Sequence, residues 1–169
     1  MEQKFEIRQL REEDAQAALN YLNEVAGETD FLSFGKGELK ITVEQEMVYI
    51  NRVNEMKNSL LLSAWDKDEL VAIGSVNELS GRFSHRVEYG ISVKKNYWRK
   101  GIAREITKQL INFAKENEVI TVIQLQVSAE NERAISLYKN FGFKEIGIYE
   151  KFFKINQNYY DAILMNLYL

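Results

Sequence analysis

Cysteine and proline are both absent from this chain of 169 residues, and histidine occurs only once, as His85. Without cysteine the chain cannot form a disulfide, a cysteine-rich zinc site or a thiol nucleophile, and one histidine excludes a histidine metal cluster. The lack of cysteine also fits a reducing compartment. At average usage a chain of this length would contain about eight prolines. We therefore expect dense regular structure without proline-rich linkers.

Long apolar runs and a strong charge imbalance are missing as well. No run of about 18 apolar residues occurs, so no membrane-spanning helix is expected. The charged start, "MEQKFEIRQLREED", lacks the apolar core of a signal peptide, which favours a cytoplasmic location. The net charge of −3 gives no support for a general nucleic-acid-binding role. With 46% apolar residues, we expect one globular domain over residues 1–169.

Hydrophobic periodicity predicts an alternation of strands and helices along the chain. Helices are expected after Glu12, after Thr42, after Gly101 and from Asn131 to about Gly142. Strands are expected at residues 5–10, 59–65, 70–76, 86–93, 119–127, 144–155 and 159–169. The order is β-α-α-β-β-β-α-β-α-β-β. The strands on either side of the third helix form a βαβ unit and should be parallel, so an α/β domain with a mixed sheet is predicted.

The segment "NYWRKGIAREITKQL" places two cations and a glycine immediately before the third helix. The first N–H groups of a helix lack intrahelical partners, and this end of the helix dipole is positive, so it binds anions. Gly101 would let the backbone approach a ligand closely, and Arg99, Lys100 and Arg104 would add charged contacts. Two interpretations remain open, a pyrophosphate site or a solvated basic turn. Neither GxxxxGK[ST] nor GxGxxG is present.

This segment resembles the acyl-CoA-binding segment of the GNAT superfamily of N-acetyltransferases, in which [Q/R]-x-x-G-x-[G/A] opens a helix after a strand. Gly101 and Ala103 match that pattern, whereas Trp98 replaces the usual Gln or Arg. Downstream, "NERAISLYKNFGF" resembles the family's N-x-x-A-x-x-[LF]-Y-x-[KR]-x-G-F segment almost position by position. The ending "NQNYYDAILM" is similar to the amino-acid and phosphinothricin-type branch, and the chain also resembles the ribosomal-protein acetyltransferases.

The resemblance implies a GNAT-like domain, with a mostly antiparallel seven-stranded sheet flanked by four helices. It also implies transfer of an acetyl group from the cosubstrate acetyl-CoA to a primary amine of a small molecule or peptide, directly in a ternary complex and without a metal. The expected partners are acetyl-CoA and an amine acceptor, without nucleic acid or membrane, and a homodimer is a further expectation. The alternative is a non-catalytic acyl-CoA-binding or sensor domain on the same fold.

In the GNAT fold the fourth and fifth strands splay apart, and the pantetheine arm lies between them. The resemblance therefore implies that main-chain groups of Ile91 and Val93 bind the pantetheine amides, although core burial alone would also explain both residues. Asn131 would bind the arm, or it would cap the following helix. The expected cofactor-binding residues are Ile91, Ser92, Val93, Arg99, Lys100, Gly101, Ile102, Ala103, Arg104, Asn131, Ala134, Leu137 and Tyr138.

Two catalytic residues are expected from the same resemblance. Tyr138 would donate a hydrogen bond or a proton to the departing CoA sulfur, whereas its spacing alone would suggest a core aromatic. Glu88 occupies the place where many GNAT relatives carry the base that deprotonates the amine, and its alternative role is a strand-edge charge. His85 is the other candidate base.

The acceptor pocket should come from the loop 27–40, the second helix and the closing hairpin. Glu28 and Asp30 of that loop would attract an amine or would simply be solvated. The candidate aromatic walls are Phe31, Phe34, Tyr149, Phe152, Phe153 and Tyr159.

Overall fold

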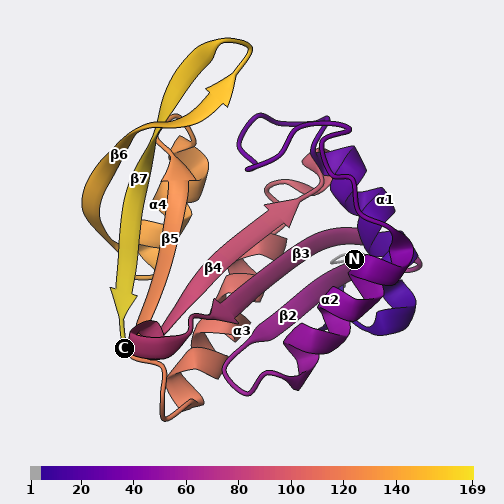
Figure 1. Ribbon diagram of the computed structural model, residues 1–169, viewed down its shortest axis with the longest axis horizontal. Coiled ribbons are helices and arrows are strands. Elements are labelled where there is room, and N and C mark those ends of the chain that lie inside the picture. The colour runs from indigo at the N-terminus through magenta and orange to yellow at the C-terminus, as the bar shows by residue number, and fades with distance from the viewer. Residues whose placement is uncertain (1–4) are drawn as a thin grey trace.

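The computed structural model describes residues 5–169, so residues 1–4, which begin the charged N-terminal stretch, lie outside the described residues. The chain forms a seven-stranded sheet with helices on both faces (Figure 1). The observed order of strands and helices is the predicted one, which confirms the predicted fold class. The elements are β1 (Glu6–Gln9), α1 (Ala15–Val25), α2 (Val43–Glu55), β2 (Leu60–Asp66), β3 (Glu69–Glu78), β4 (Arg86–Val93), α3 (Ile102–Glu116), β5 (Val122–Ser128), α4 (Glu132–Asn140), β6 (Lys144–Ile155) and β7 (Asn158–Tyr168).

The strand order in the sheet is β1-β2-β3-β4-β5-β7-β6. β4 and β5 are parallel and are connected through α3, as the βαβ pattern predicts. Every other pair of neighbouring strands in the described part of the chain is antiparallel. The sheet is therefore mixed and mostly antiparallel. No helix within residues 5–169 is long and apolar enough to cross a membrane.

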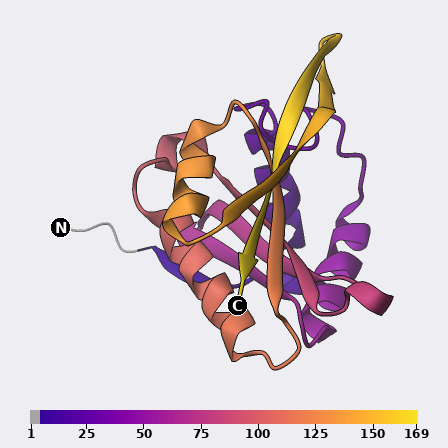
Figure 2. The same ribbon diagram turned by 90° about the vertical axis from the view of Figure 1, so that its left-hand side faces the viewer.

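Two hydrophobic cores lie on opposite faces of the sheet. Figure 2 shows the helices that cover these two faces. α3 buries Ile102, Ile106 and Leu110, which recur every four residues and form one apolar stripe. This stripe and α4 pack against one face. α1 and α2 pack against β2 and β3 on the other face, where Tyr21 and Ile50 are almost fully buried. The sheet thus separates the face covered by α3 and α4 from the face covered by α1 and α2, and residues of the candidate site lie on both faces.

β4 and β5 are paired for only part of their length. Their register pairs join Arg86–Glu88 to Val122–Gln124, whereas β4 continues to Val93 and β5 to Ser128. The strands separate beyond these pairs, which is the splay that the resemblance implied. β4 remains paired with β3 as far as Val93, so one edge of β4 is hydrogen-bonded along its length. The other edge is unpaired beyond Glu88.

Two predicted boundaries illustrate how local chemistry sets the elements. α2 begins after Thr42 as expected and opens with a capping box, because Thr42 Oγ1 accepts from the Gln45 N–H and Gln45 Oε1 accepts from the Thr42 N–H. β5 begins at Val122, later than the predicted position 119. Asn117 Oδ1 accepts hydrogen bonds from the N–H groups of Val119 and Ile120 and holds this segment in a turn.

Substitution Gly74→Ala tests the packing of α3 on the sheet. A Cβ at this position of β3 would lie 2.5 Å from Cγ2 of the fully buried Ile106. We expect the free energy of unfolding in urea to fall by about 1–3 kcal/mol, because overpacking a core displaces side chains and backbone. Gly90→Ala in β4 is the control, since its Cβ meets no atom within 4 Å, and it should change stability by less than about 0.5 kcal/mol. Equal losses in both variants would contradict this packing.

Candidate functional site

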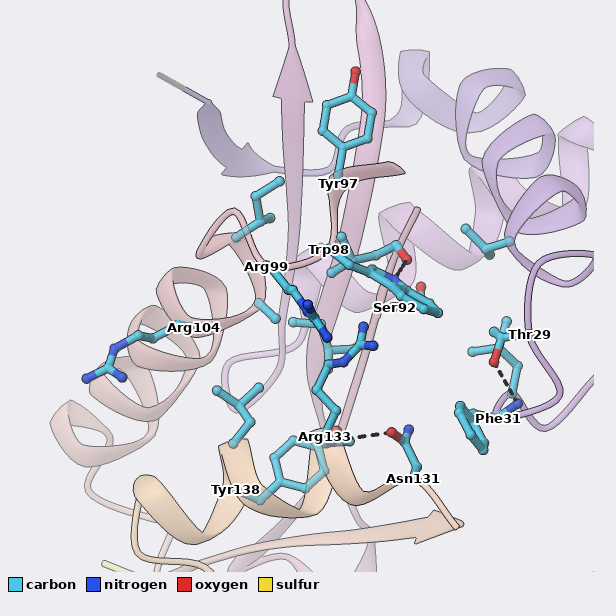
Figure 3. Close-up of a pocket in the computed structure, with 18 of the residues that line it drawn as sticks. Thr29, Phe31, Ser92, Tyr97, Trp98, Arg99, Arg104, Asn131, Arg133 and Tyr138 are labelled. Carbon is cyan, nitrogen blue, oxygen red and sulfur yellow. Dashed lines mark hydrogen bonds between the residues drawn. The ribbon is translucent and has the colours of Figure 1, made fainter. Parts of the chain in front are cut away.

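A cavity of about 580 Å³ opens where β4 leaves β5. Its walls come from the end of β4, the turn before α3 and the first turn of that helix, one side of α4 and the loop that follows α1 (Figure 3). The cavity brings together all the predicted cofactor-binding residues except Lys100. Those that line it are Ile91, Ser92, Val93, Arg99, Gly101, Ile102, Ala103, Arg104, Asn131, Ala134, Leu137 and Tyr138.

The first turn of α3 presents uncapped backbone donors to this cavity. Gly101 precedes the helix with φ +80°, and no side chain of the described residues caps it. Arg99 also has a left-handed backbone, with φ +64°. A non-glycine residue in this conformation costs about 1–2 kcal/mol, and such strain gathers at ligand-binding turns. The N–H groups that begin the helix therefore remain available for an anion.

Two guanidinium groups approach this end of the cavity from opposite walls. Figure 3 shows Arg99 from the turn and Arg133 from α4 directed toward one another. Arg104 also lines the cavity, but its guanidinium is directed away and lies 5.9 Å from the centre of the Phe141 ring. The guanidiniums that converge across the cavity are thus those of Arg99 and Arg133, and a charged contact from Arg104 stays a prediction. Two converging guanidiniums suit a doubly charged phosphate ligand.

Lys100 does not line the cavity. Its ammonium lies 4.5 Å from the centre of the Tyr97 ring, which is a cation–π contact. The Tyr97 hydroxyl in turn lies within hydrogen-bond distance of the carboxylates of Asp66 and Glu69, and its one proton is donated to either of them. Binding of the cofactor by the Lys100 side chain therefore stays a prediction.

Trp98, the departure from the family pattern, has two roles in this geometry. Its indole Nε1–H donates to the Val93 carbonyl at 2.8 Å, which ties the turn to the end of β4. Its ring also lies 4.3 Å from the guanidinium carbon of Arg133. Trp98 therefore positions Arg133 across the cavity. It also occupies one lone pair of the Val93 carbonyl, which leaves the second for a ligand.

Asn131 is the N-cap of α4, because its Oδ1 accepts a hydrogen bond from the Ala134 N–H at 3.2 Å. The alternative structural interpretation of Asn131 is therefore correct. The residue also lines the cavity (Figure 3). Since a cap uses only the amide oxygen, the amide NH₂ remains a donor for a ligand.

Tyr138 is 6% exposed and lies at the inner end of the cavity. Its ring packs edge-to-face on Tyr89, with centroids 5.5 Å apart. Tyr89 and Thr107 share a hydrogen bond of 2.7 Å, and because Thr107 donates its proton to the Ala103 carbonyl, Tyr89 must donate to Thr107. Burial raises the pKa of Tyr138. Tyr138 therefore keeps its proton at neutral pH and can donate it.

Glu88 lies on the opposite face of β4 from Tyr89. Val87 and Tyr89 face the α3 core, so Glu88, Gly90 and Ser92 share the other face. Glu88 does not line the 580 Å³ cavity, but Ser92 does. Gly90 is exposed and meets no neighbour on this side. An open strip over Gly90 therefore connects Glu88 to the cavity, and Glu88 and Tyr138 flank β4 from opposite faces.

The loop after α1 forms one wall of the 580 Å³ cavity, and no sequence motif indicated which of its residues face the cavity. Thr29, Phe31 and Leu32 line the cavity. The carboxylate of the predicted Glu28 accepts a hydrogen bond from the Lys95 N–H at 2.8 Å, and its attraction of an amine stays a prediction. The neighbouring Lys94 is nearly buried and pairs with Glu24 and Glu69 at 2.7 and 2.8 Å. These contacts hold the end of α1 and its loop against the turn that precedes α3.

The predicted aromatic walls divide between two locations. Phe31 and Phe153 line a smaller cavity of about 210 Å³ between this loop and the β6–β7 hairpin. Tyr149, Phe152 and Tyr159 are exposed on the hairpin, and Phe34 lines neither this cavity nor the larger one.

Comparison with known proteins places this geometry among acetyltransferases. Residues 19–143 match the model of the acetyltransferase (GNAT) family. A [ribosomal protein bS18]-alanine N-acetyltransferase of Salmonella typhimurium is 30% identical over 122 residues, which are 72% of this chain and 78% of that protein. The match spans about half the length of two further relatives, the [ribosomal protein bS18]-alanine N-acetyltransferase and the L-amino acid N-acetyltransferase AaaT of Escherichia coli.

Solved structures agree over almost the whole chain. An acetyltransferase of the GNAT family from Streptococcus pneumoniae superposes with a TM-score of 0.94 and 26% identity, covering 98% of this chain and 100% of that one. The yncA protein of Salmonella typhimurium, solved with its cofactor acetyl-CoA, superposes with a TM-score of 0.85 and 17% identity, covering 98% and 94%.

Substitution Gly101→Ala tests the anion site at the start of α3. Alanine at φ +80° is strained by about 1–2 kcal/mol, and a ligand that needs this turn must restore the strained form. We expect the affinity for ADP, measured by calorimetry as a pyrophosphate probe, to fall about 5- to 30-fold. Gly81→Ala is the matched control, because Gly81 also has a positive φ, +63°, and open surroundings but lies in another turn. Equal losses of ADP affinity in both variants would rule out a local effect.

Proposed function

This chain belongs to the GNAT family of acetyltransferases, and on that basis we propose that it transfers the acetyl group of acetyl-CoA to a primary amine of a small molecule or peptide. The observation that carries the proposal is the 580 Å³ cavity, which joins an uncapped helix start flanked by Arg99 and Arg133 to the buried hydroxyl of Tyr138. A pyrophosphate at one end and a thioester at the other fit these two chemistries. The acetyl-CoA in the yncA structure of the same fold supports this donor.

In this proposal the cofactor follows the separation of the strands. The pyrophosphate binds the N–H groups at the start of α3 and the guanidiniums of Arg99 and Arg133. The pantetheine arm replaces β5 along the open edge of β4 and bonds main-chain groups of Ile91 and Val93. On the other side it passes α4, where Asn131, Ala134 and Leu137 line the cavity.

The reaction proposed is a direct transfer in a ternary complex. The amine approaches over Gly90 and gives its proton to Glu88, directly or through water. The amine nitrogen then attacks the thioester carbonyl, whose oxygen is stabilised by a backbone N–H of β4. The C–S bond breaks and the CoA sulfur takes a proton from Tyr138. The nitrogen of the new amide releases its second proton, which restores Tyr138 through solvent, and Glu88 returns the first proton to solvent, so the products are an amide and CoA. Holding both substrates in this arrangement supplies a large part of the rate.

The wider expectations follow the same proposal. We expect residues 1–169 to act as one domain in the cytoplasm and to need no metal. A homodimer is supported by the edge strand β6, where Ile146, Ile148 and Tyr149 are at least half exposed. The alternative is a non-catalytic acyl-CoA sensor, which would bind acetyl-CoA tightly but release no CoA with any amine.

Substitution Tyr138→Phe removes the proposed acid while keeping the buried ring. We expect kcat to fall about 100-fold, because general acid catalysis typically contributes that much or more, while the Kd for acetyl-CoA changes less than about threefold. Stopped assays that trap the CoA thiol measure the first quantity and calorimetry the second. Equal losses in kcat and affinity would mean that Tyr138 is structural. Since burial raises the pKa of Tyr138, its deprotonation should cause no decline of the wild-type rate between pH 7 and pH 9.

Substitution Glu88→Gln tests the proposed base. An alkylamine with a pKa of about 10.4 needs deprotonation more than an α-amino group with a pKa near 8. We therefore expect kcat/KM at neutral pH to fall further for the alkylamine than for an amino-acid amide, by about tenfold or more. Glu116→Gln, at the far, exposed end of α3, is the control. A uniform loss for both amines would argue for a structural role of Glu88.

A further inference from the structure

A second cavity, of about 370 Å³, lies on the face of the sheet that α1 and α2 cover. Its floor is formed by β2 and β3, and its walls come from both helices and from the end of the loop between them. The lining is largely apolar, apart from a few polar side chains. The lining residues are Leu10, Leu22, Leu39, Ile41, Gln45, Glu46, Tyr49, Leu61, Ile73 and Ser75. We call it the Glu46 cavity.

Glu46 is 4% exposed, and within residues 5–169 no group donates a hydrogen bond to its carboxylate or pairs with it. The carboxylate oxygens are not among the fully buried atoms, so they open to the cavity rather than into packed protein. A carboxylate in a largely apolar cavity without a partner is still costly, and burial raises the pKa of Glu46 with no opposing interaction. Asp14 shows the usual solution in the same protein. It is equally buried but accepts two hydrogen bonds from Arg8, at 2.7 and 2.9 Å, and one from the Arg11 N–H.

The Glu46 cavity adjoins the place where acetyl transfer is proposed. In the register of β3 and β4, Ser75 lies opposite Gly90 and Ile73 lies opposite Ser92. Paired residues on neighbouring strands share a face and are about 5 Å apart. Ser75 and Ile73 line the Glu46 cavity, and the space above Gly90 is open. Ser92 lines the 580 Å³ cavity in which we propose that acetyl-CoA binds, and which we call the cofactor cavity. A molecule lying over Gly90 therefore has the cofactor on one side and the Glu46 cavity on the other.

We infer that the Glu46 cavity holds the non-reacting arm of the amine acceptor, and that Glu46 binds a second cationic group at the end of that arm. The inference rests on the proposed function, because it takes the reacting amine to lie over Gly90. The apolar lining fits an aliphatic arm, and the lone carboxylate fits an ammonium or guanidinium. The acceptor class is therefore a diamine or a molecule with a lysine-like or arginine-like side chain. A simple alkylamine would fill the cavity but leave Glu46 unpaired.

The test compares unbranched diamines, from diaminopropane to cadaverine, with the alkylamines of equal length. We measure kcat/KM with saturating acetyl-CoA for the wild type, Glu46→Gln and Glu44→Gln. Glu44 is exposed in the first turn of the same helix, so its variant makes the same charge change outside the cavity. We expect the wild type and Glu44→Gln to prefer one diamine over its alkylamine about 10- to 100-fold, and Glu46→Gln to lose this preference. If no diamine is preferred, or if Glu46→Gln retains the preference, the inference is wrong.

Two further measurements separate this inference from the proposed function and from misfolding. Calorimetry with cadaverine and the other diamines, without acetyl-CoA, measures binding of the acceptor in the absence of the reaction. Of the wild type, Glu44→Gln and Glu46→Gln, only Glu46→Gln should lose this binding. Thermal unfolding should show Glu46→Gln to be at least as stable as the wild type, because a buried unpaired charge is removed. Turnover of alkylamines and diamines at equal rates would overturn the inference and leave the acetyltransferase intact. Diamine binding without turnover of any amine would overturn the proposed function instead.

Discussion

The separation of β4 from β5 is the constraint on which the rest of the site depends. Backbone pairing stops at Glu88 and Gln124, so the remaining edge of β4 has donors and acceptors that no neighbouring strand uses. α3 connects the two strands and brings its uncapped start to the mouth of this gap, while α4 covers the gap from the same face. A linear ligand with a charged end and an amide-containing arm can replace the missing strand pairing. Without the separation, the arginines and Tyr138 would have no shared cavity.

The alternation of side chains along β4 divides the chemistry between two faces. Tyr89 turns toward the α3 core and supports Tyr138, whereas Glu88, Gly90 and Ser92 turn toward the side of α1 and α2. In the proposed reaction, the acid Tyr138 therefore lies on the face of β4 that receives acetyl-CoA, and the base Glu88 lies on the face that receives the amine. The thioester carbonyl lies between these two residues, next to the backbone of β4. The Glu46 cavity continues the acceptor side by one more strand.

The fold and most of the cofactor cavity could be predicted because short motifs govern backbone geometry. The Gly101 turn and the Asn131 cap act within a few residues, so their spacing in the sequence fixes them. Arg133 was missed and Lys100 was placed in the cavity because side-chain direction depends on contacts between elements, such as the Trp98 ring under Arg133. Glu46 did leave a signal. It lies between Val43 and Ile50 on the buried stripe of α2, where a charge is unexpected.

The short links between α1, its loop and the turn before α3, where we propose that the pyrophosphate binds, have a consequence for how the two substrates influence each other. Glu28 holds the Lys95 N–H, and Lys94 bridges Glu24 and Glu69, directly before the turn that contains Arg99. The same loop supplies Phe31 to the cofactor cavity and Leu39 to the Glu46 cavity. Any shift of the turn on nucleotide binding would therefore reshape the acceptor wall. Linkage makes such an effect reciprocal, so donor and acceptor affinities would be coupled through the protein as well as through the contact of the two molecules at the thioester.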